Sequence, residues 1–180
     1  MPEKGFSRGL SRRRGVIQPV LFARRGPEMV TRKVTLAAAD WAQGKKNKVR
    51  LGNMQARRDW GFAGDYVRAM HAMLQQEKPA DYVIATGESH SVYEFVVEVL
   101  RCLDLVPEGR NVADAVNDYV EVDPKLFRTG EIHDLRGDAT RARESLKWQP
   151  TVDFKGLVRM MVESDTKLAK EIPHVATTRV

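Results

Sequence analysis

The chain has 180 residues, 42% of them hydrophobic, and a formal net charge of +6, which is enough sequence for one globular domain. No run of about 18 apolar residues occurs, which argues against a membrane span, and no apolar signal-peptide core follows the N-terminus. The single cysteine, Cys102, excludes an internal disulfide and fits a reducing cytosol. We therefore expect a cytoplasmic protein in which Cys102 is a structural thiol.

The positive charge is concentrated near the N-terminus. Residues 1–33 contain nine Lys or Arg and two acids, whereas the remainder contains 21 Lys or Arg and 22 acids. Such a segment can bind nucleic acid through its phosphates, but no helix-turn-helix, zinc or RNA-recognition signature follows it. We expect residues 1–23 to be a disordered basic leader, with a transit peptide as an alternative, and residues 173–180 to be a frayed tail.

Apolar periodicity and breaker residues predict a series of short elements. In chain order they are an edge strand within 15–22 containing Pro19, a helix over about 27–43, a strand over 48–51, a helix over about 65–76, a strand over 82–85, a helix after Ser91, a loop over 104–117, a strand over 119–122, a helix capped by Asp138 and reaching about Trp148, and a last helix capped by Asp153. Strands that alternate with helices indicate an α/β architecture.

Two of these helices carry specific local expectations. Ser91 and Glu94 form a capping-box pattern, in which hydroxyl and carboxylate each accept from the other residue's backbone N–H. In the helix over 65–76, Val67, Met70 and Leu74 follow Tyr66 at helical spacing, so we expect these four residues to form its buried face. The four histidines are far apart and no His/Cys/Asp cluster has ligand spacing, so we expect no metal site.

The segment Arg58-Asp-Trp-Gly-Phe-Ala-Gly-Asp-Tyr-Val67 places an arginine just ahead of a predicted helix. Backbone N–H groups also point outward at a helix start, so the two together favour a phosphate or diphosphate. The same pattern is also typical of a surface ion pair or a helix cap, and taken alone it does not decide between these interpretations.

Longer runs carry a resemblance. Residues 48–76 and the continuation Asp81-Tyr-Val-Ile-Ala-Thr-Gly-Glu-Ser-His-Ser-Val92 closely resemble GDP-mannose 4,6-dehydratase, a family of extended short-chain dehydrogenase/reductases. The resemblance covers about residues 24–170 and looks like the C-terminal half of that family. It implies a small α/β substrate-binding lobe, over 24–172, of an NAD(P)-binding Rossmann-type enzyme, with few short strands, about five helices and the Rossmann core largely missing.

The resemblance implies conversion of GDP-mannose to GDP-4-dehydro-6-deoxymannose, with NADP as cofactor and a homo-oligomer in the intact family. Cofactor binding needs a glycine-rich turn, and the family's catalytic pair is Tyr-x-x-x-Lys. The 13 glycines never fall as G-x-G-x-x-G after a strand, and no tyrosine is followed four positions later by lysine. We therefore assign no catalytic residue and expect neither NADP binding nor turnover by this chain alone.

The resemblance does assign a sugar-nucleotide site. Val30 and Lys33 match positions that contact the nucleotide, Arg58 and Arg128 match arginines on the diphosphate, and Glu131 matches a contact to ribose or guanine. Arginine suits this role because its planar fork binds phosphate oxygens in pairs. We expect these five residues to converge on one concave site for GDP-mannose.

Some positions depart from the family. Arg25 matches an arginine that reaches cofactor phosphate, but residues 19–23 replace the family's Asn-His-Glu-Ser-Pro, Phe62 replaces a histidine, and Thr129 replaces a proline. Two alternatives stay open: a non-catalytic remnant that binds GDP-sugars or pairs with an intact subunit, and a basic-tailed nucleic-acid binder. A lobe without its partner half would also expose an apolar face, so we expect association.

Overall fold

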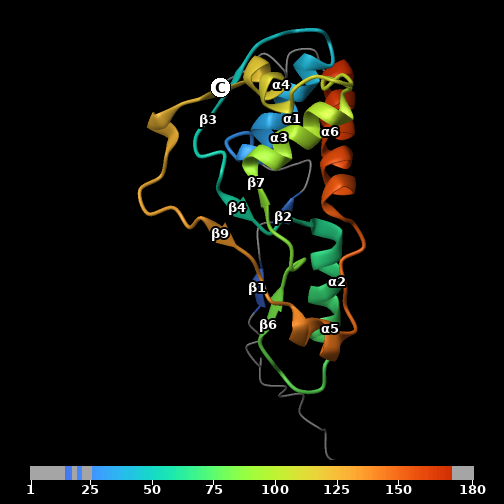
Figure 1. The fold of residues 1–180 in the computed structure, drawn as a ribbon. Coiled ribbons are helices and arrows are strands. Elements are labelled where there is room, and N and C mark those ends of the chain that lie inside the picture. The colour runs from blue at the N-terminus through green and yellow to red at the C-terminus, as the bar shows by residue number, and fades with distance from the viewer. Residues whose placement is uncertain (1–14, 18–19, 22–25, 172–180) are drawn as a thin grey trace, which may run out of the picture.

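The computed structural model describes residues 15–17, 20–21 and 26–171, in which α-helices and short strands alternate (Figure 1). The helices are α1 (Val30–Trp41), α2 (Ala63–Leu74), α3 (Val92–Cys102), α4 (Val112–Tyr119), α5 (Thr140–Leu146) and α6 (Phe154–Glu171), with a 3-10 turn, η1, over Pro124–Leu126. The strands are β1 (Gly15–Ile17), β2 (Val20–Leu21), β3 (Val49–Leu51), β4 (Arg57–Arg58), β5 (Gly61–Phe62), β6 (Tyr82–Ile84), β7 (His90–Ser91), β8 (Val120–Val122) and β9 (Asp134–Leu135).

The strands form small sheets rather than one continuous sheet. Three parallel pairs, β1–β6, β2–β5 and β3–β8, stand beside a three-stranded sheet in the order β7–β4–β9. The predicted α/β class with few short strands is confirmed. The strand predicted within 15–22 is divided between β1 and β2, whereas Pro19, most of the predicted leader and the tail over 173–180 lie outside the described residues.

The capping box at the start of α3 is confirmed. The Glu94 backbone N–H donates to the Ser91 hydroxyl at 3.0 Å, and the Ser91 backbone N–H donates to the Glu94 carboxylate at 2.8 Å. Burial and the charge of Glu98 raise the pKa of the half-buried Cys102 thiol at the other end of this helix, which disfavours the nucleophilic thiolate.

The prediction of a loop over 104–117 was wrong, because α4 occupies the second half of this segment. The Asn111 side chain caps this helix by accepting the Ala113 backbone N–H at 2.8 Å. Ala115, Val116 and Tyr119 then form its buried face. Helix α4 has only eight residues, so its apolar repeat is too short to stand out in the sequence.

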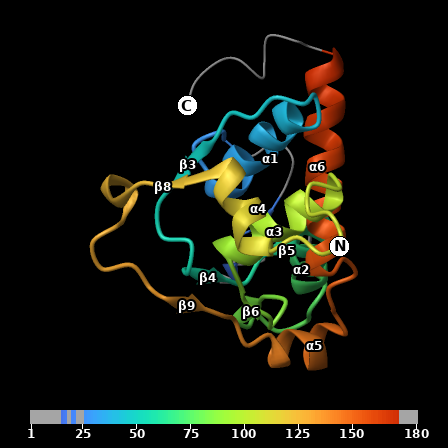
Figure 2. The ribbon, with the colours of Figure 1, turned by 45° about the horizontal axis from the view of Figure 1, so that its top comes forward.

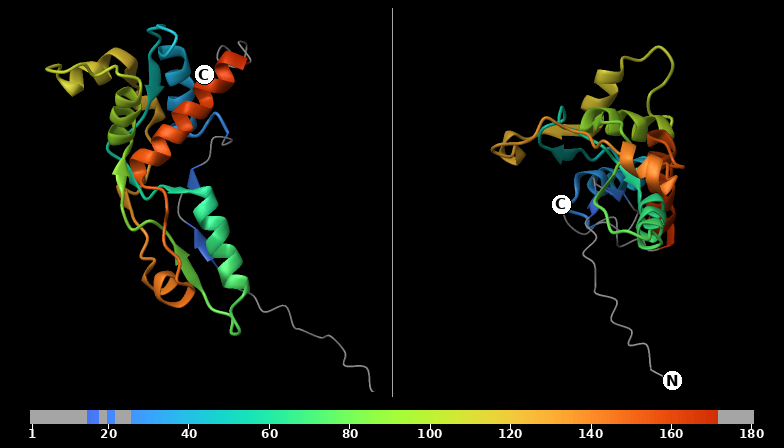
Figure 3. Two further views of the ribbon diagram at one scale, coloured as in Figure 1. Left: turned by 90° about the vertical axis from the view of Figure 1, so that its right-hand side faces the viewer. Right: turned by 90° about the horizontal axis from the view of Figure 1, so that it is seen from below.

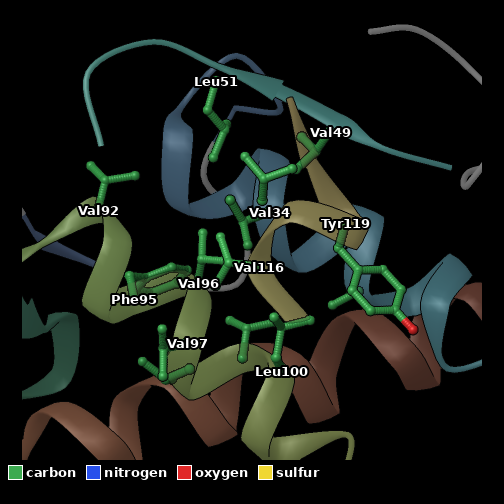
Figure 4. Packing of buried hydrophobic residues seen from close by; sticks show 14 of the residues in the cluster. Val34, Val49, Leu51, Val92, Phe95, Val96, Val97, Leu100, Val116 and Tyr119 are labelled. Atoms are coloured by element: carbon green, nitrogen blue, oxygen red, sulfur yellow. The ribbon is translucent and has the colours of Figure 1, made fainter. Parts of the chain in front are cut away.

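The main core lies among four helices. We call this part, made of α1, α3, α4 and α6 with strands β3 and β8, the four-helix region (Figure 2). Val34 of α1, Leu100 of α3 and Val116 of α4 point toward one another there (Figure 4). Each is at most 4% exposed, so burial on several sides stabilises this region.

A smaller core lies around α2, α5, β1 and β6, which we call the α2–α5 region (Figure 3). Here α2 buries Tyr66, Ala69 and Met73. The predicted buried face was correct for Tyr66 but wrong for Val67, Met70 and Leu74, which are 62%, 40% and 65% exposed. Helix α2 carries two apolar stripes, and the sequence alone does not show which of them packs on the strands.

Asp59 joins the two regions. This buried carboxylate follows β4 and accepts the backbone N–H groups of Thr86, Gly87 and Gly137 at 2.9, 2.9 and 3.2 Å, and also the Thr86 hydroxyl at 2.7 Å. Thr86 and Gly87 follow β6, and Gly137 precedes α5. The loops of the α2–α5 region are therefore fixed to the strand that leads toward the candidate site.

Candidate functional site

A cavity of about 710 Å³ opens between the start of α1, strand β3 with the loop after it, and the segment that follows β8. That segment, residues 123–133, runs out from the body as an open arm between β8 and β9, and we call it the 123–133 arm (Figures 1 and 2). The structure brings together the five residues assigned by resemblance, since the cavity is lined by Val30, Lys33, Arg58, Arg128 and Glu131. Their binding roles stay a prediction.

The first turn of α1 forms one wall. Met29 precedes the helix without a side-chain cap, and the first turn contains no acidic residue. Val30 and Lys33 are half-buried and face the cavity from this turn. A helix start of this kind leaves backbone N–H groups and a partial positive charge beside the space, which suits an anion.

Arg58 is anchored mainly by the protein itself. Its Nη1 donates to the Arg57 and Ile132 carbonyl oxygens, each at 2.7 Å, and its Nη2 lies 3.2 Å from a Glu131 carboxylate oxygen. Both side chains of this ion pair are more than three-quarters buried. Arg58 therefore fastens the end of the 123–133 arm to strand β4.

Glu131 is held from a second side by Asn53. The Asn53 amide donates to the other Glu131 carboxylate oxygen at 2.9 Å, and its own oxygen accepts the Gln55 backbone N–H at the same distance. Arg128, by contrast, is exposed, and the described part of the chain offers it no hydrogen bond or ion pair. Its guanidinium is thus available to a ligand.

The lining residues that the sequence analysis did not assign include Arg50, Gly52 and Asn53. A Cβ atom on Gly52 would lie 2.6 Å from the Leu126 carbonyl oxygen, so only glycine lets the arm approach the loop after β3 this closely. Gly52 and Asn53 fall within the run that resembles the family, which was the available signal. Arg50 had none, because its place depends on the pairing of β3 with β8.

A second, smaller cavity of about 210 Å³ also has Trp60 in its lining. His90 lines it and stacks on Phe154 at 3.8 Å between ring centroids, beside Glu88 and Glu94. His90 is partly buried in β7, and its neighbour Ser91 is the cap of α3. This arrangement fills space between β7 and α6.

The remaining assignments fare differently. Arg25 and residues 22–24 lie outside the described residues. Phe62, which stands where the family has histidine, is half-buried and precedes α2 without a side-chain cap. Thr129 is exposed on the arm beside Gly130, whose φ of +72° favours glycine.

Solved structures of other proteins share this fold. RMD from Pseudomonas aeruginosa, complexed with NADPH, gives a TM-score of 0.72 at 16% identity over 86% of this chain and 48% of its own. The dTDP-glucose 4,6-dehydratase of Bacillus anthracis, in complex with NAD, gives 0.67 at 18% identity over 87% and 45%. The chain therefore has the fold of about half of each of these two proteins.

Sequence comparison identifies the family to which the chain belongs. The family model of GDP-mannose 4,6 dehydratase matches residues 8–161, and the chain belongs to that family. This match begins at residue 8, whereas the sequence resemblance was expected to begin at about Arg24.

Relatives show how much of the family's length is present. GDP-mannose 4,6 dehydratase 2 of Arabidopsis thaliana is 51% identical over 147 residues, which cover 82% of this chain and 37% of that protein. The human GDP-mannose 4,6 dehydratase is 43% identical over 159 residues, covering 84% and 43%. The chain thus spans less than half the length of these relatives. Among the described residues, no helix combines the length and apolar character needed to cross a membrane.

Proposed function

We propose that this chain is the sugar-nucleotide-binding portion of a GDP-mannose 4,6-dehydratase and binds GDP-mannose in the 710 Å³ cavity. The observation that carries the proposal is convergence. Five positions spread over residues 30–131 were assigned from family resemblance, and all five line one space. No local rule of folding requires such distant residues to meet, and a common role in binding one ligand would explain why they do.

The charges in the cavity suit a diphosphate. Four basic side chains and two acidic ones line it: Lys33, Arg50, Arg58, Arg128, Glu28 and Glu131. A sugar nucleotide carries one negative charge on each of its two phosphates, so the surplus of positive charge complements it. Glu131, oriented by Asn53 and Arg58, is the acceptor for ribose hydroxyls or for the guanine N–H groups.

The residues present do not fit NADP. The sequence contains no glycine-rich turn after a strand and no Tyr-x-x-x-Lys pair. We therefore propose that hydride transfer is not performed by this chain alone, although the family's whole enzymes would use the cofactor. A cytoplasmic location and a homo-oligomeric assembly are part of the same proposal. The nucleic-acid alternative depends on a basic segment that lies mostly outside the described residues, and no observed contact favours it.

Calorimetric titration with GDP-mannose tests the binding. Arg128→Ala is the informative variant, because Arg128 is exposed and its loss leaves no buried group unpaired. Losing a charge-assisted bond of roughly 1.5–3 kcal/mol weakens binding about tenfold or more. Arg101→Ala is the matched control, since Arg101 is exposed on α3 and does not line the cavity. Binding that is absent, or unaffected by Arg128→Ala, contradicts the proposal.

A turnover assay separates binding from catalysis. The purified 180-residue chain, supplied with GDP-mannose and NADP, should form no GDP-4-dehydro-6-deoxymannose. Measurable product would refute the proposal that this chain alone lacks the hydride-handling chemistry. Product that appears only after addition of an intact family enzyme, above that enzyme's own rate, would favour the subunit-pairing alternative.

A further inference from the structure

Two cations share one wall of the cavity, and no carboxylate of the described structure bonds to both of them. Lys33 reaches it from α1 and Arg50 from the neighbouring strand β3, and both line the same space. In the described part of the chain, the Lys33 ammonium makes no hydrogen bond or ion pair. Burial lowers the pKa of the Lys33 ammonium and the charge of Arg50 lowers it further, whereas Asp123 raises it. Because both cations line the same cavity, their positive charges repel each other.

Asp123 does not relieve this repulsion fully. One of its carboxylate oxygens lies 2.5 Å from Arg50 Nη2, and the other accepts the Lys125 backbone N–H at 2.9 Å. Glu121 is more distant, at 3.9 Å from Arg50 Nε. With both Asp123 oxygens already engaged, no carboxylate of this wall bonds directly to Lys33.

Arg58, the arginine assigned to the diphosphate by resemblance, is the most fully committed cation of the cavity. Its Nη1 donates to two carbonyl groups and its Nη2 pairs with Glu131. Arg50 keeps more capacity, since its side chain is 56% exposed and no partner bonds to its Nη1 in the described structure. Among these two arginines, Arg50 offers the more available donors.

We propose that Arg50 is an anion-binding residue of this cavity, which together with Lys33 holds the phosphates of a nucleoside diphosphate, while Arg58 acts as a positioning residue for Glu131. The inference deepens the proposed function and rests on it for the identity of the ligand. Its physical basis is general: an anion placed between two repelling cations gains from both and removes their mutual repulsion.

The ion pair with Asp123 prepares Arg50 for this role. It fixes one guanidinium nitrogen on the strand β8 side and leaves the rest of the planar fork, so less conformational freedom is lost when a phosphate binds. The start of α1 adds its partial positive charge from the Lys33 side. The competing interpretation is that Arg50 only ties β3 to β8, and the experiment must separate the two.

Affinities of the full chain for GDP, guanosine and inorganic pyrophosphate make that separation. Arg50→Ala should weaken binding of GDP and pyrophosphate about tenfold or more, while guanosine, which has no phosphate, binds as to the original chain. Arg50→Lys keeps a positive charge beside Asp123 but lacks the planar guanidinium. Compared with Arg50→Ala, it should recover the thermal stability lost with the ion pair but only part of the GDP affinity. Arg101→Ala should change nothing.

Proton uptake gives a readout that a purely structural role does not move. An anion beside Lys33 raises the pKa of its ammonium, so just below the ordinary lysine value of 10.5 the complex takes up protons. Titrations in buffers of different ionisation enthalpy measure this uptake. In Arg50→Ala, the pKa of Lys33 is already closer to its ordinary value before the anion binds, so fewer protons should be taken up on binding.

The outcomes distinguish the two proposals. If GDP binds equally well to the original chain and to Arg50→Ala, or if guanosine loses as much affinity as GDP, the role of Arg50 is refuted and GDP binding stands. If pyrophosphate binds with dependence on Arg50 but GDP-mannose and GDP do not, the anion site stands and the proposed function fails. If none of these ligands binds, both fail.

Discussion

The four-helix region and the α2–α5 region differ in how completely their helices are covered. Among the described residues, the main core contains 21 buried residues, all but Met54 and Trp60 from four helices and two strands, whereas the smaller core contains ten. Helix α3 of the four-helix region buries six of its eleven residues, but α2 buries four of twelve and turns Val67 and Leu74 to solvent. The helices of the four-helix region cover one another's apolar faces, whereas α2 has an apolar face that nothing covers in the described structure.

The candidate site follows this division. Its walls come from the four-helix region, strands β4 and β9, the loop after β3 and the 123–133 arm, and none comes from α2 or α5. A binding site needs side chains that are held by the packing around them, and the four-helix region provides that. We therefore expect the ligand cavity to be more tolerant of damage in the α2–α5 region than of damage in the four-helix region.

Matched truncations should produce the largest contrast. Leu100→Ala, at a fully buried position, is expected to destabilise the chain by about 3–5 kcal/mol, and Leu146→Ala, at 9% exposure, by about 2–3 kcal/mol, because a site at the rim collapses more easily onto the vacated space. Denaturant titration measures both values. Equal values, or a larger loss for Leu146→Ala, would show that the smaller core is the better packed.

The junction between the regions gives the next effect. Asp59→Asn keeps one acceptor oxygen but turns an amide N–H₂ toward backbone donors such as Gly87 and Gly137. Leaving buried donors unpaired costs about 1–3 kcal/mol each, so we expect a loss of about 2–4 kcal/mol in unfolding free energy. The prediction that Asp138 caps α5 was wrong, because Ala139 is the N-cap and has no side-chain cap. Asp138 is exposed and accepts the Thr140 backbone N–H and hydroxyl, which an asparagine oxygen also accepts, so Asp138→Asn should be indistinguishable from the original chain.

Hydrogen exchange should locate the damage in Asp59→Asn. Amides of β6 and α5 should lose protection first, because their loops are the ones fixed by Asp59. Uniform loss across α3 and α6 as well would mean that the two regions unfold as one cooperative unit.

What the sequence could predict is what depends on neighbours in the chain. The capping box at Ser91 and the cap at Asp153, which accepts the Gly156 backbone N–H at 2.8 Å, need only a few residues of context. The nucleotide positions were found through a family resemblance. Arg50 and the packed stripe of α2 were missed because each is decided by an element distant in sequence: β8 in the first case, β6 and α5 in the second.

Lowering the pH should change the stability contributions of one buried aspartate in each region in opposite directions. Burial opposes ionisation of Asp65, but hydrogen bonds from Thr151 and Val152, with the charge of Arg68, outweigh it and hold the pKa of Asp65 below its ordinary value. The stability that Asp65 contributes is therefore present above its unfolded pKa, about 4, and is lost as the pH falls through the folded value. Asp65→Asn should cost about 1–2 kcal/mol at neutral pH and progressively less in acid.

Asp165 in the four-helix region has the opposite sign. Burial raises its pKa despite the Thr35 hydroxyl at 2.6 Å and Arg32 at 2.7 Å. A carboxyl with a raised folded pKa takes up its proton more readily in the native state, so its contribution to stability grows as the pH falls through that value. Denaturant titrations from neutral to acid pH should give Asp65→Asn and Asp165→Asn opposite changes in slope, and parallel slopes would contradict the assignment.

The smallest effect on stability, and the most specific effect on behaviour, should come from the uncovered stripe of α2. Val67 and Leu74 are 62% and 65% exposed, with Met70 between them. Changing Val67 and Leu74 together to lysine buries no charge, so the unfolding free energy should move by less than about 0.5 kcal/mol. Association, if this stripe drives it, should fall sharply, because two ammonium groups would have to lose their water at the contact. Sedimentation velocity over a range of concentrations measures it, with Met160→Lys, at 43% exposure on α6, as the matched control. An original chain that stays monomeric at high concentration, or association that Met160→Lys weakens as much as the double variant does, would show that the uncovered stripe of α2 does not drive association.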